Sequence, residues 1–115
     1  MANELFRFPS AEQAATACGD RILELLAAAR GERGVAMLAV SGGSTPRAMF
    51  QYLAGRTFDW TGVELFWVDE RMAPPADSQS NFRMTREALL DAIPLPAAQI
   101  HRIKGELTPD EAARE

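Results

Sequence analysis

The feature that most constrains this chain is an apolar run at residues 35–40 that leads directly into the segment SGGSTP at 41–46. A continuous apolar run of this length is typical of a central strand in a parallel sheet, covered on both faces. Two glycines permit a tight turn and let a ligand approach the main chain closely. Thr45 can cap a helix that begins at Pro46. The junction therefore predicts a strand, a turn free of bulky side chains and a helix.

The turn at 41–46 has the properties of an anion site. N–H groups at a helix N-terminus point outward with the positive end of the helix dipole behind them, and the hydroxyls of Ser44 and Thr45 stand beside them. This arrangement suits a phosphate monoester and needs no lysine. The segment has neither the P-loop pattern nor the glycine pattern of dinucleotide-binding folds, so it does not indicate a nucleotide. The alternative is a tight connection without a ligand.

Strand and helix patterns alternate along the rest of the chain. Short apolar runs indicate strands, and apolar residues at a three-and-four spacing indicate a helix with one buried face. Ser10 can cap the first helix, and either Ser80 or Asn81 can cap a later one. The expected strands are 5–8, 35–40, 63–68 and 100–103; the first helix is expected to bury Ala15, Cys18, Ile22, Leu25, Leu26 and Ala29 and to close at Gly31 and Gly34. The order predicts an α/β fold with a mostly parallel sheet and flanking helices.

Composition limits the possible partners. The 115 residues, 47% hydrophobic with a net charge of −4, fit one α/β domain and show no basic stripe, so neither nucleic acid nor an anionic membrane is an expected partner. No apolar run is long enough to span a membrane, and residues 1–4 lack the pattern of a secretory signal. The single cysteine, Cys18, excludes an internal disulfide and is expected to pack in a reducing cytoplasm. Histidine, cysteine and carboxylates show no metal-ligand spacing, so no metal is expected.

A charged triplet, Asp69-Glu70-Arg71, follows the expected strand at 63–68. In open α/β sheets, ligands bind beyond the carboxyl ends of the strands. If strands 35–40 and 63–68 are neighbours, the triplet and the glycine turn share one crevice. Arg71 can then hold a phosphate or sugar oxygen in a bidentate contact, and Asp69 can accept from sugar hydroxyls or orient Arg71. The alternative is a solvated strand end.

The segment 108–111 has every feature of a helix start, with Thr108 as N-cap, Pro109 at the first position and a capping-box Glu111. Few residues follow it, and an isolated helix needs about 12 to 15 residues to be even marginally stable. We therefore expect residues 1–115 to be the N-terminal part of a larger domain. Missing strands would leave a sheet edge uncovered, through which the chain could self-associate.

Four segments in this order, SGGSTP at 41–46, FWVDER at 66–71, SN at 80–81 and IHRIKGE at 100–106, resemble the 6-phosphogluconolactonase family. The resemblance implies a Rossmann-like α/β sheet, shared with glucosamine-6-phosphate deaminase and ribose-5-phosphate isomerase. It implies hydrolysis of 6-phospho-D-glucono-1,5-lactone to 6-phosphogluconate in the pentose phosphate pathway, with no organic cofactor. The residues that it places at the phosphosugar are Gly42, Gly43, Ser44, Thr45, Asp69 and Arg71.

The general base of the family is a histidine in a later segment resembling Gly-x-Gly-x-Asp-Gly-His, and residues 72–115 contain no match. We therefore expect the base beyond Glu115 and the 115-residue chain alone to be inactive. His101 lies in the segment that the family carries well before its base, so its expected role is structural. Two alternatives stay open. One is a deaminase or sugar-phosphate isomerase of the same fold, although the family likeness there involves a tyrosine in place of Arg71. The other is a non-catalytic phosphosugar-binding module.

Overall fold

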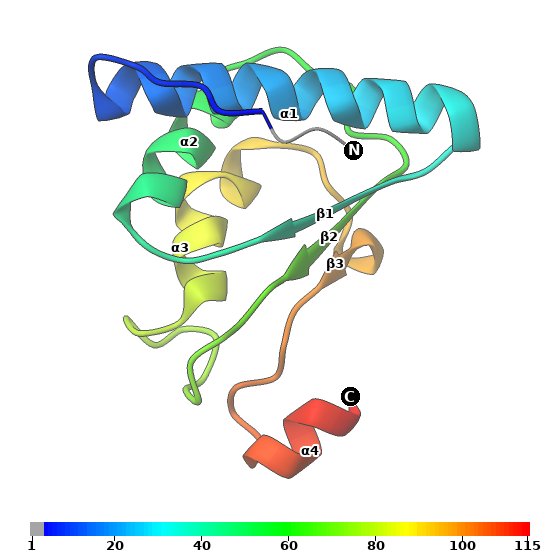
Figure 1. The fold of residues 1–115 in the computed structure, drawn as a ribbon. Helices are drawn as coiled ribbons and strands as arrows, with labels where there is room; N and C mark the ends of the chain where they lie inside the picture. The colour runs from blue at the N-terminus through cyan, green and yellow to red at the C-terminus, as the bar shows by residue number, and fades with distance from the viewer. Residues whose placement is uncertain (1–3) are drawn as a thin grey trace.

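Three parallel strands form the centre of the structure, with helices packed against one side (Figure 1). The computed structural model describes residues 4–115. The elements in chain order are α1 (Ala11–Arg33), β1 (Ala36–Val40), α2 (Ser44–Ala54), β2 (Val63–Trp67), α3 (Asn81–Ala88), the 3₁₀ helices η1 (Leu90–Ala92) and η2 (Ala97–Gln99), β3 (Ile100–His101) and α4 (Pro109–Arg114). This order confirms the expected α/β class.

The sheet has the strand order β1-β2-β3, and both pairs of neighbouring strands are parallel. Ala36 pairs with Val63, and Val40 pairs with Trp67, so β1 and β2 end side by side. Parallel neighbours need crossover connections, which the segments containing α2 and α3 supply. The glycine turn and the charged triplet therefore leave the sheet at the same edge, as the sequence predicts.

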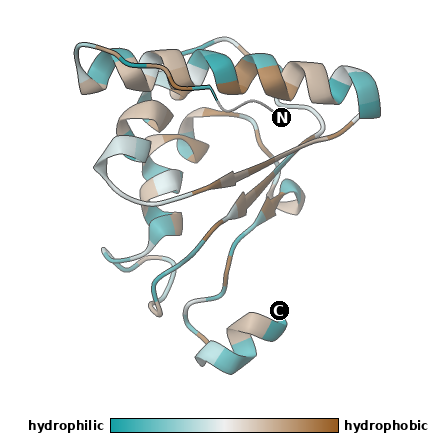
Figure 2. Ribbon diagram, in the orientation of Figure 1, coloured by the Kyte–Doolittle hydropathy of each residue, from teal (hydrophilic) through white to brown (hydrophobic). Residues whose placement is uncertain are grey.

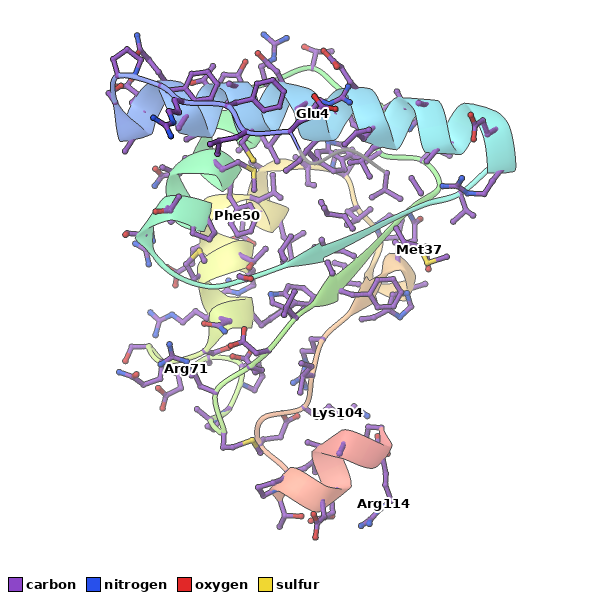
Figure 3. All side chains as sticks on the ribbon, viewed as in Figure 1. Glu4, Met37, Phe50, Arg71, Lys104 and Arg114 are labelled. Atoms are coloured by element: carbon purple, nitrogen blue, oxygen red, sulfur yellow. The ribbon has the colours of Figure 1, made fainter. Side chains whose placement is uncertain are left out.

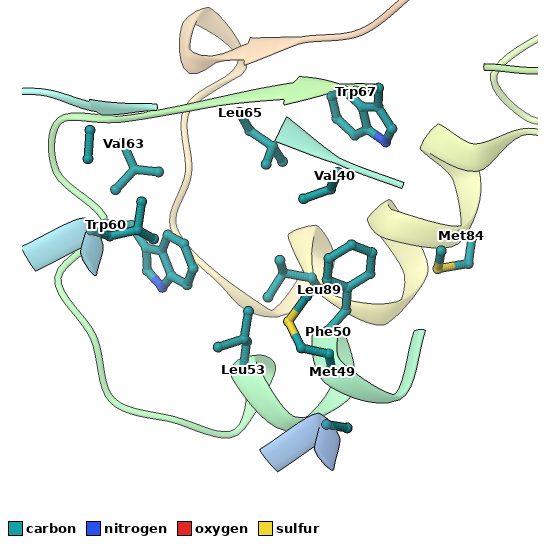
Figure 4. Close-up of a cluster of buried hydrophobic side chains, with 13 residues drawn as sticks. Val40, Met49, Phe50, Leu53, Trp60, Val63, Leu65, Trp67, Met84 and Leu89 are labelled. Atoms are coloured by element: carbon teal, nitrogen blue, oxygen red, sulfur yellow. The ribbon is translucent and has the colours of Figure 1, made fainter. Parts of the chain in front are cut away.

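The core lies between one face of the sheet and the helices (Figure 4). Because side chains alternate across a strand, every second residue of β1 and β2 points into this layer. Phe50 and Leu53 of α2, with Leu89 after α3, are fully buried against them. Figure 2 shows the strands as the most hydrophobic part of the ribbon. The strand residues of this layer are Ala36, Val40, Val63, Leu65 and Trp67.

The opposite face of the sheet carries no helix within residues 4–115. Met37 of β1 is 70% exposed, and Figure 3 shows it on the side away from α2. Ala39, two residues along the same face, is also exposed. The prediction that residues 35–40 are covered on both faces is therefore wrong for the described chain, because α1, α2 and α3 all pack on the side of Ala36 and Val40.

Residues 5–8 form no strand, contrary to the prediction. Leu5 and Phe6 are 78% and 66% exposed, and none of the described strands pairs with them. Instead the segment runs along α1 (Figure 1), where Phe8 and Pro9 lie against the start of the helix. An alternating apolar pattern forms a strand only where a neighbour supplies the hydrogen bonds and a surface to bury.

Helix α1 begins at the expected cap, Ser10, and ends at Gly34, whereas Gly31, which was also expected to close it, lies inside the helix. The Ser10 hydroxyl accepts a hydrogen bond from the Gln13 N–H at 3.2 Å, and Gly34 ends the helix with a φ of 77°. The expected buried face is partly wrong, because Cys18 and Leu25 are exposed. Helix α1 contacts α2 through small residues, and a Cβ on Gly19 would lie 2.7 Å from the Tyr52 ring. This close approach turns Cys18 toward solvent.

Residues 1–3, which belong to the N-terminus expected to lack a secretory signal, lie outside the described residues. From residue 4 onward, none of the helices combines the length and the apolar character needed to cross a membrane. Within the same range, histidine, cysteine and carboxylate side chains form no group of three that could hold a metal ion.

Candidate functional site

The glycine turn after β1 brings the chain into α2 two residues earlier than predicted. Helix α2 begins at Ser44, and Gly43 is its N-cap with a φ of 114°. This positive φ strains any residue with a side chain and makes glycine the natural residue there. Thr45 lies inside the first turn and makes no capping hydrogen bond, so the prediction that Thr45 caps the helix is wrong. Gly43, which has no side chain, thus occupies the N-cap position without a side-chain hydrogen bond.

The first N–H groups of α2 are available to a ligand. Arg47 donates the first helical hydrogen bond, from its N–H to the Gly43 carbonyl at 3.1 Å. Within residues 4–115, the N–H groups of Ser44 and Thr45 have no acceptor in the protein, and both residues are exposed. Unpaired amides at the positive end of a helix dipole favour an anion. The start of α2 therefore meets the physical requirement for a phosphate site.

The second part of the site, after β2, is organised by Glu70. Its carboxylate accepts hydrogen bonds from the N–H groups of Arg71 at 2.7 Å, Asn81 at 2.6 Å and Phe82 at 2.9 Å, and from the Ser80 hydroxyl at 3.1 Å. Ser80 itself caps α3, since its Oγ accepts from the Arg83 N–H at 3.1 Å. A carboxylate at a helix N-terminus is favoured by the dipole. Glu70 thus fastens the start of α3 to the end of β2.

Asn81 links the two strand ends. The residue is only 7% exposed, and its Nδ2 lies 3.3 Å from both the carbonyl oxygen and Oδ1 of Asp69. On its other side, the Asn81 side chain lies so close to Gly42 that a Cβ at position 42 would collide with its Oδ1. Gly42 from the first loop and Asp69 from the second are therefore brought together through one buried amide.

Arg71 lies in the loop after β2 and is exposed (Figure 3). Its carbonyl packs against Gly105, where a Cβ would collide with the Arg71 oxygen and lie 2.7 Å from the Ala73 oxygen. Within the described residues the Arg71 guanidinium makes no ion pair or hydrogen bond, so its charge is free for a ligand. The structure thus brings Asp69 to the glycine turn, whereas it shows no contact between Arg71 and that turn.

Sequence reasoning missed the contributions of Glu70 and Gly105. The signal for Glu70 was present, because a carboxylate beside a strand end can cap the next helix as well as bind a ligand. The contact of Gly105 with the loop of Arg71 depends on a tertiary approach that a single sequence does not encode. His101 is the last residue of β3, where its Nε2 is 2.8 Å from Glu64 Oε1 and its ring stacks on Phe66. This position agrees with its expected structural role.

A parallel sheet flanked by helices, with a glycine turn at the carboxyl end of its first strand, is a Rossmann-like α/β fold, in which ligands bind beyond the carboxyl ends of the strands. A family model described as glucosamine-6-phosphate isomerases/6-phosphogluconolactonase matches residues 9–115, and the chain belongs to this family.

Relatives and solved structures agree with this membership. A 6-phosphogluconolactonase of Rhizobium meliloti (strain 1021) is 48% identical over 86 residues, which are 75% of this chain and 36% of the relative. The crystal structure of 6-phosphogluconolactonase from Thermotoga maritima has a TM-score of 0.81 at 26% identity, covering 87% of this chain and 46% of that chain. A monomeric glucosamine-6-phosphate deaminase shares the fold, with a TM-score of 0.83 at 13% identity over 97% of this chain and 47% of that chain. The chain thus spans less than half the length of these proteins.

Proposed function

We propose that the protein acts in the hydrolysis of 6-phospho-D-glucono-1,5-lactone to 6-phosphogluconate in the pentose phosphate pathway, and that this chain supplies the phosphosugar-binding part of the site. The observation that carries the proposal is that the N–H groups of Ser44 and Thr45, at the start of α2, have no acceptor within residues 4–115. Relatives named 6-phosphogluconolactonase support the same activity by resemblance. The proposal includes a cytoplasmic location, in keeping with the single cysteine.

In this proposal the phosphate of the substrate binds at the start of α2, beside Gly42, Gly43, Ser44 and Thr45. The amides of the first turn donate to the phosphate oxygens, and the helix dipole favours their charge. Asp69 accepts hydrogen bonds from sugar hydroxyls. Arg71 contributes a charge-assisted contact to a sugar or phosphate oxygen. These groups hold the substrate by its phosphate and sugar hydroxyls, so that the lactone carbonyl at the other end is oriented for hydrolysis.

Hydrolysis also needs a base that activates water and donors for the oxyanion that forms at the lactone carbonyl. The single histidine, His101, is held on β3 by Glu64 and by stacking on Phe66, so we do not assign it as this base. We propose that residues 1–115 are the N-terminal part of a larger lactonase domain and that the base lies outside them. The chain alone is then a binding part without turnover.

Calorimetry with 6-phosphogluconate tests the binding loop. Gly43→Val forces a branched side chain onto a φ of 114° and displaces the first amides of α2, so affinity should fall by about tenfold or more. Gly55→Val, at the other end of α2 where φ is −90°, is the matched control and should leave affinity unchanged. Equal affinity of the Gly43→Val variant and the wild type would reduce the turn to a structural connection.

Turnover assays separate the proposal from its alternatives. The purified chain should not accelerate lactone hydrolysis above the spontaneous rate, and acceleration would show that the base lies within residues 1–115. A deaminase of the same fold is the second candidate, favoured by the likeness to the glucosamine-6-phosphate deaminase structure. Release of ammonia from glucosamine 6-phosphate would favour that candidate. Binding of 6-phosphogluconate by a longer form that turns over neither substrate would favour a non-catalytic module.

A further inference from the structure

We propose that Asn81 is a positioning residue that fixes the glycine turn after β1 against Asp69, in the loop after β2. This role rests on the proposed function and deepens it, because it sets the distance between two groups that would bind one ligand. Asn81 would act through Gly42 and Asp69 without touching the substrate.

The main chain of Asn81 is held from two directions. Its N–H donates to Glu70 Oε1 at 2.6 Å, which ties it to the end of β2. Its carbonyl accepts from the Thr85 hydroxyl at 3.0 Å, and Trp67 Nε1 donates to the same hydroxyl at 3.1 Å. Both Thr85 and Trp67 are buried. The backbone of Asn81 therefore has little freedom to move relative to β2, and its side chain projects from a fixed point.

The direction of the side-chain amide is also determined. Nδ2 lies 3.3 Å from two oxygens of Asp69, which can only accept, so the donor end of the amide must face β2. The Oδ1 end then faces the Gly42 main chain. An amide held in this way spans the gap between the two strand ends, with one end on each loop.

The contact explains why position 42 carries glycine. Positive φ is found at Gly34, Gly43 and Gly62 and not at Gly42, so the backbone there would accept alanine. The obstacle to a Cβ at Gly42 is the Asn81 side chain, which supplies all three of its nearest atoms. Gly42 and Asn81 are thus a complementary pair, in which the missing Cβ makes room for the amide.

This pairing predicts different effects on two ligands. Inorganic phosphate needs only the start of α2, whereas 6-phosphogluconate extends from that helix to Asp69. Replacing Asn81 with alanine would leave the glycine turn intact, but the distance between the turn and Asp69 would no longer be fixed. In calorimetry, Asn81→Ala should lower the affinity for 6-phosphogluconate by about tenfold and change that for phosphate by less than about twofold. Glu87→Ala, an exposed change on α3, should alter neither.

A double-mutant cycle in urea tests the pairing without any ligand. Gly42→Ala should lower the unfolding midpoint of the full chain, because its Cβ meets the Asn81 side chain. In the Asn81→Ala background the same change should have less than about half this effect, since the collision is gone. Equal shifts in both backgrounds, or equal losses of affinity for phosphate and 6-phosphogluconate in Asn81→Ala, would overturn the positioning role. A wild-type chain that binds neither ligand would overturn the proposed function, and the ligand-positioning role with it.

Discussion

Two glycines, Gly42 and Gly105, lie where neighbouring atoms occupy the space that a Cβ would need. Gly42 faces Asn81, and Gly105 faces the main chain of Arg71 and Ala73. Neither has a positive φ, in contrast to Gly43. Alanine should have different effects at Gly42 and Gly105. At Gly42 the collision can be relieved by moving the Asn81 side chain, whereas at Gly105 the collision is with main chain and displaces a loop.

Gly105→Ala should destabilise the fold by about 1–3 kcal/mol, since the added Cβ meets backbone atoms of the loop that carries Arg71. The free energy of unfolding in urea measures this effect. Gly31→Ala is the matched control, because nothing lies within 4 Å of its Cβ position in α1, and it should stabilise by about 0.5–1 kcal/mol. A Gly105→Ala variant as stable as the wild type would show that the loop has room to move.

The sequence was sufficient to predict the local structure at some of the proposed site residues and insufficient at others. Gly43 and Ser44 followed from local rules, because a glycine turn before a helix leaves amides unpaired whatever surrounds it. Asp69 followed from its place at a strand end. The link through Asn81 did not follow, because it requires α3 to lie across the ends of both β1 and β2, a property of packing between distant segments. Local capping rules give Asn81 a role in its own helix only.

The strands whose bounds the sequence predicted correctly are those with a long apolar run, whereas β3 covers only Ile100–His101 of the strand expected at 100–103. β1 and β2 were found within a residue of their bounds, and their parallel pairing followed from the helix between them. The prediction of a strand at residues 5–8 failed because a short alternating pattern does not indicate whether a partner strand exists. The prediction that Cys18 is buried failed because the approach of α1 to α2 depends on Gly19, and hydrophobic periodicity does not take glycine into account.

The connection from β3 to α4 contains an ion pair that gives a pH-dependent signal. The Arg102 guanidinium donates to both carboxylate oxygens of Glu106, at 2.8 Å and 2.6 Å, and these hydrogen bonds lower the pKa of Glu106 from 4.5 to about 2. A carboxylate with a lowered pKa stabilises the fold above its unfolded pKa. This stabilisation is lost as the pH falls from about 4.5 through about 2.

We expect the Glu106 carboxyl to titrate near pH 2 in the wild type and to move up toward 4.5 in the Arg102→Gln variant, followed by carbon-detected NMR. Glu87, whose pKa is lowered chiefly by its hydrogen bond from Arg83, is the internal control and should titrate at the same pH in both proteins. Titration of Glu106 near its ordinary value in the wild type would mean that the ion pair does not persist in solution.

The sheet has a free edge at β1, and this edge bears on how the molecule behaves in solution. Within residues 4–115, β1 pairs with β2 alone, so its outer edge presents unpaired backbone groups next to the exposed Met37. Such an edge is a template for pairing with another chain. Self-association of the chain through this edge, expected from the sequence, remains a proposal that the strand order supports.

Met37→Lys should reduce self-association, because a charge beside a free edge opposes pairing between strands. Sedimentation velocity over a range of protein concentrations would measure the change in mass distribution. Met72→Lys, at a residue 51% exposed in the loop after β2, is the matched control with the same change of charge. If both variants associate as the wild type does, contact between copies occurs elsewhere on the surface.

The bond from the Trp67 indole to Thr85 places a natural fluorophore at the joint between β2 and α3. The fluorescence emission of an indole depends on the polarity of its surroundings and on its hydrogen bonding. A tilt of α3 should therefore alter the emission spectrum of Trp67 without an added label. The second indole, at Trp60, is buried near Phe58 and away from this joint, and replacing it with phenylalanine would leave a single reporter. The fluorescence of Trp67 can therefore report a ligand-induced movement of α3 relative to β2.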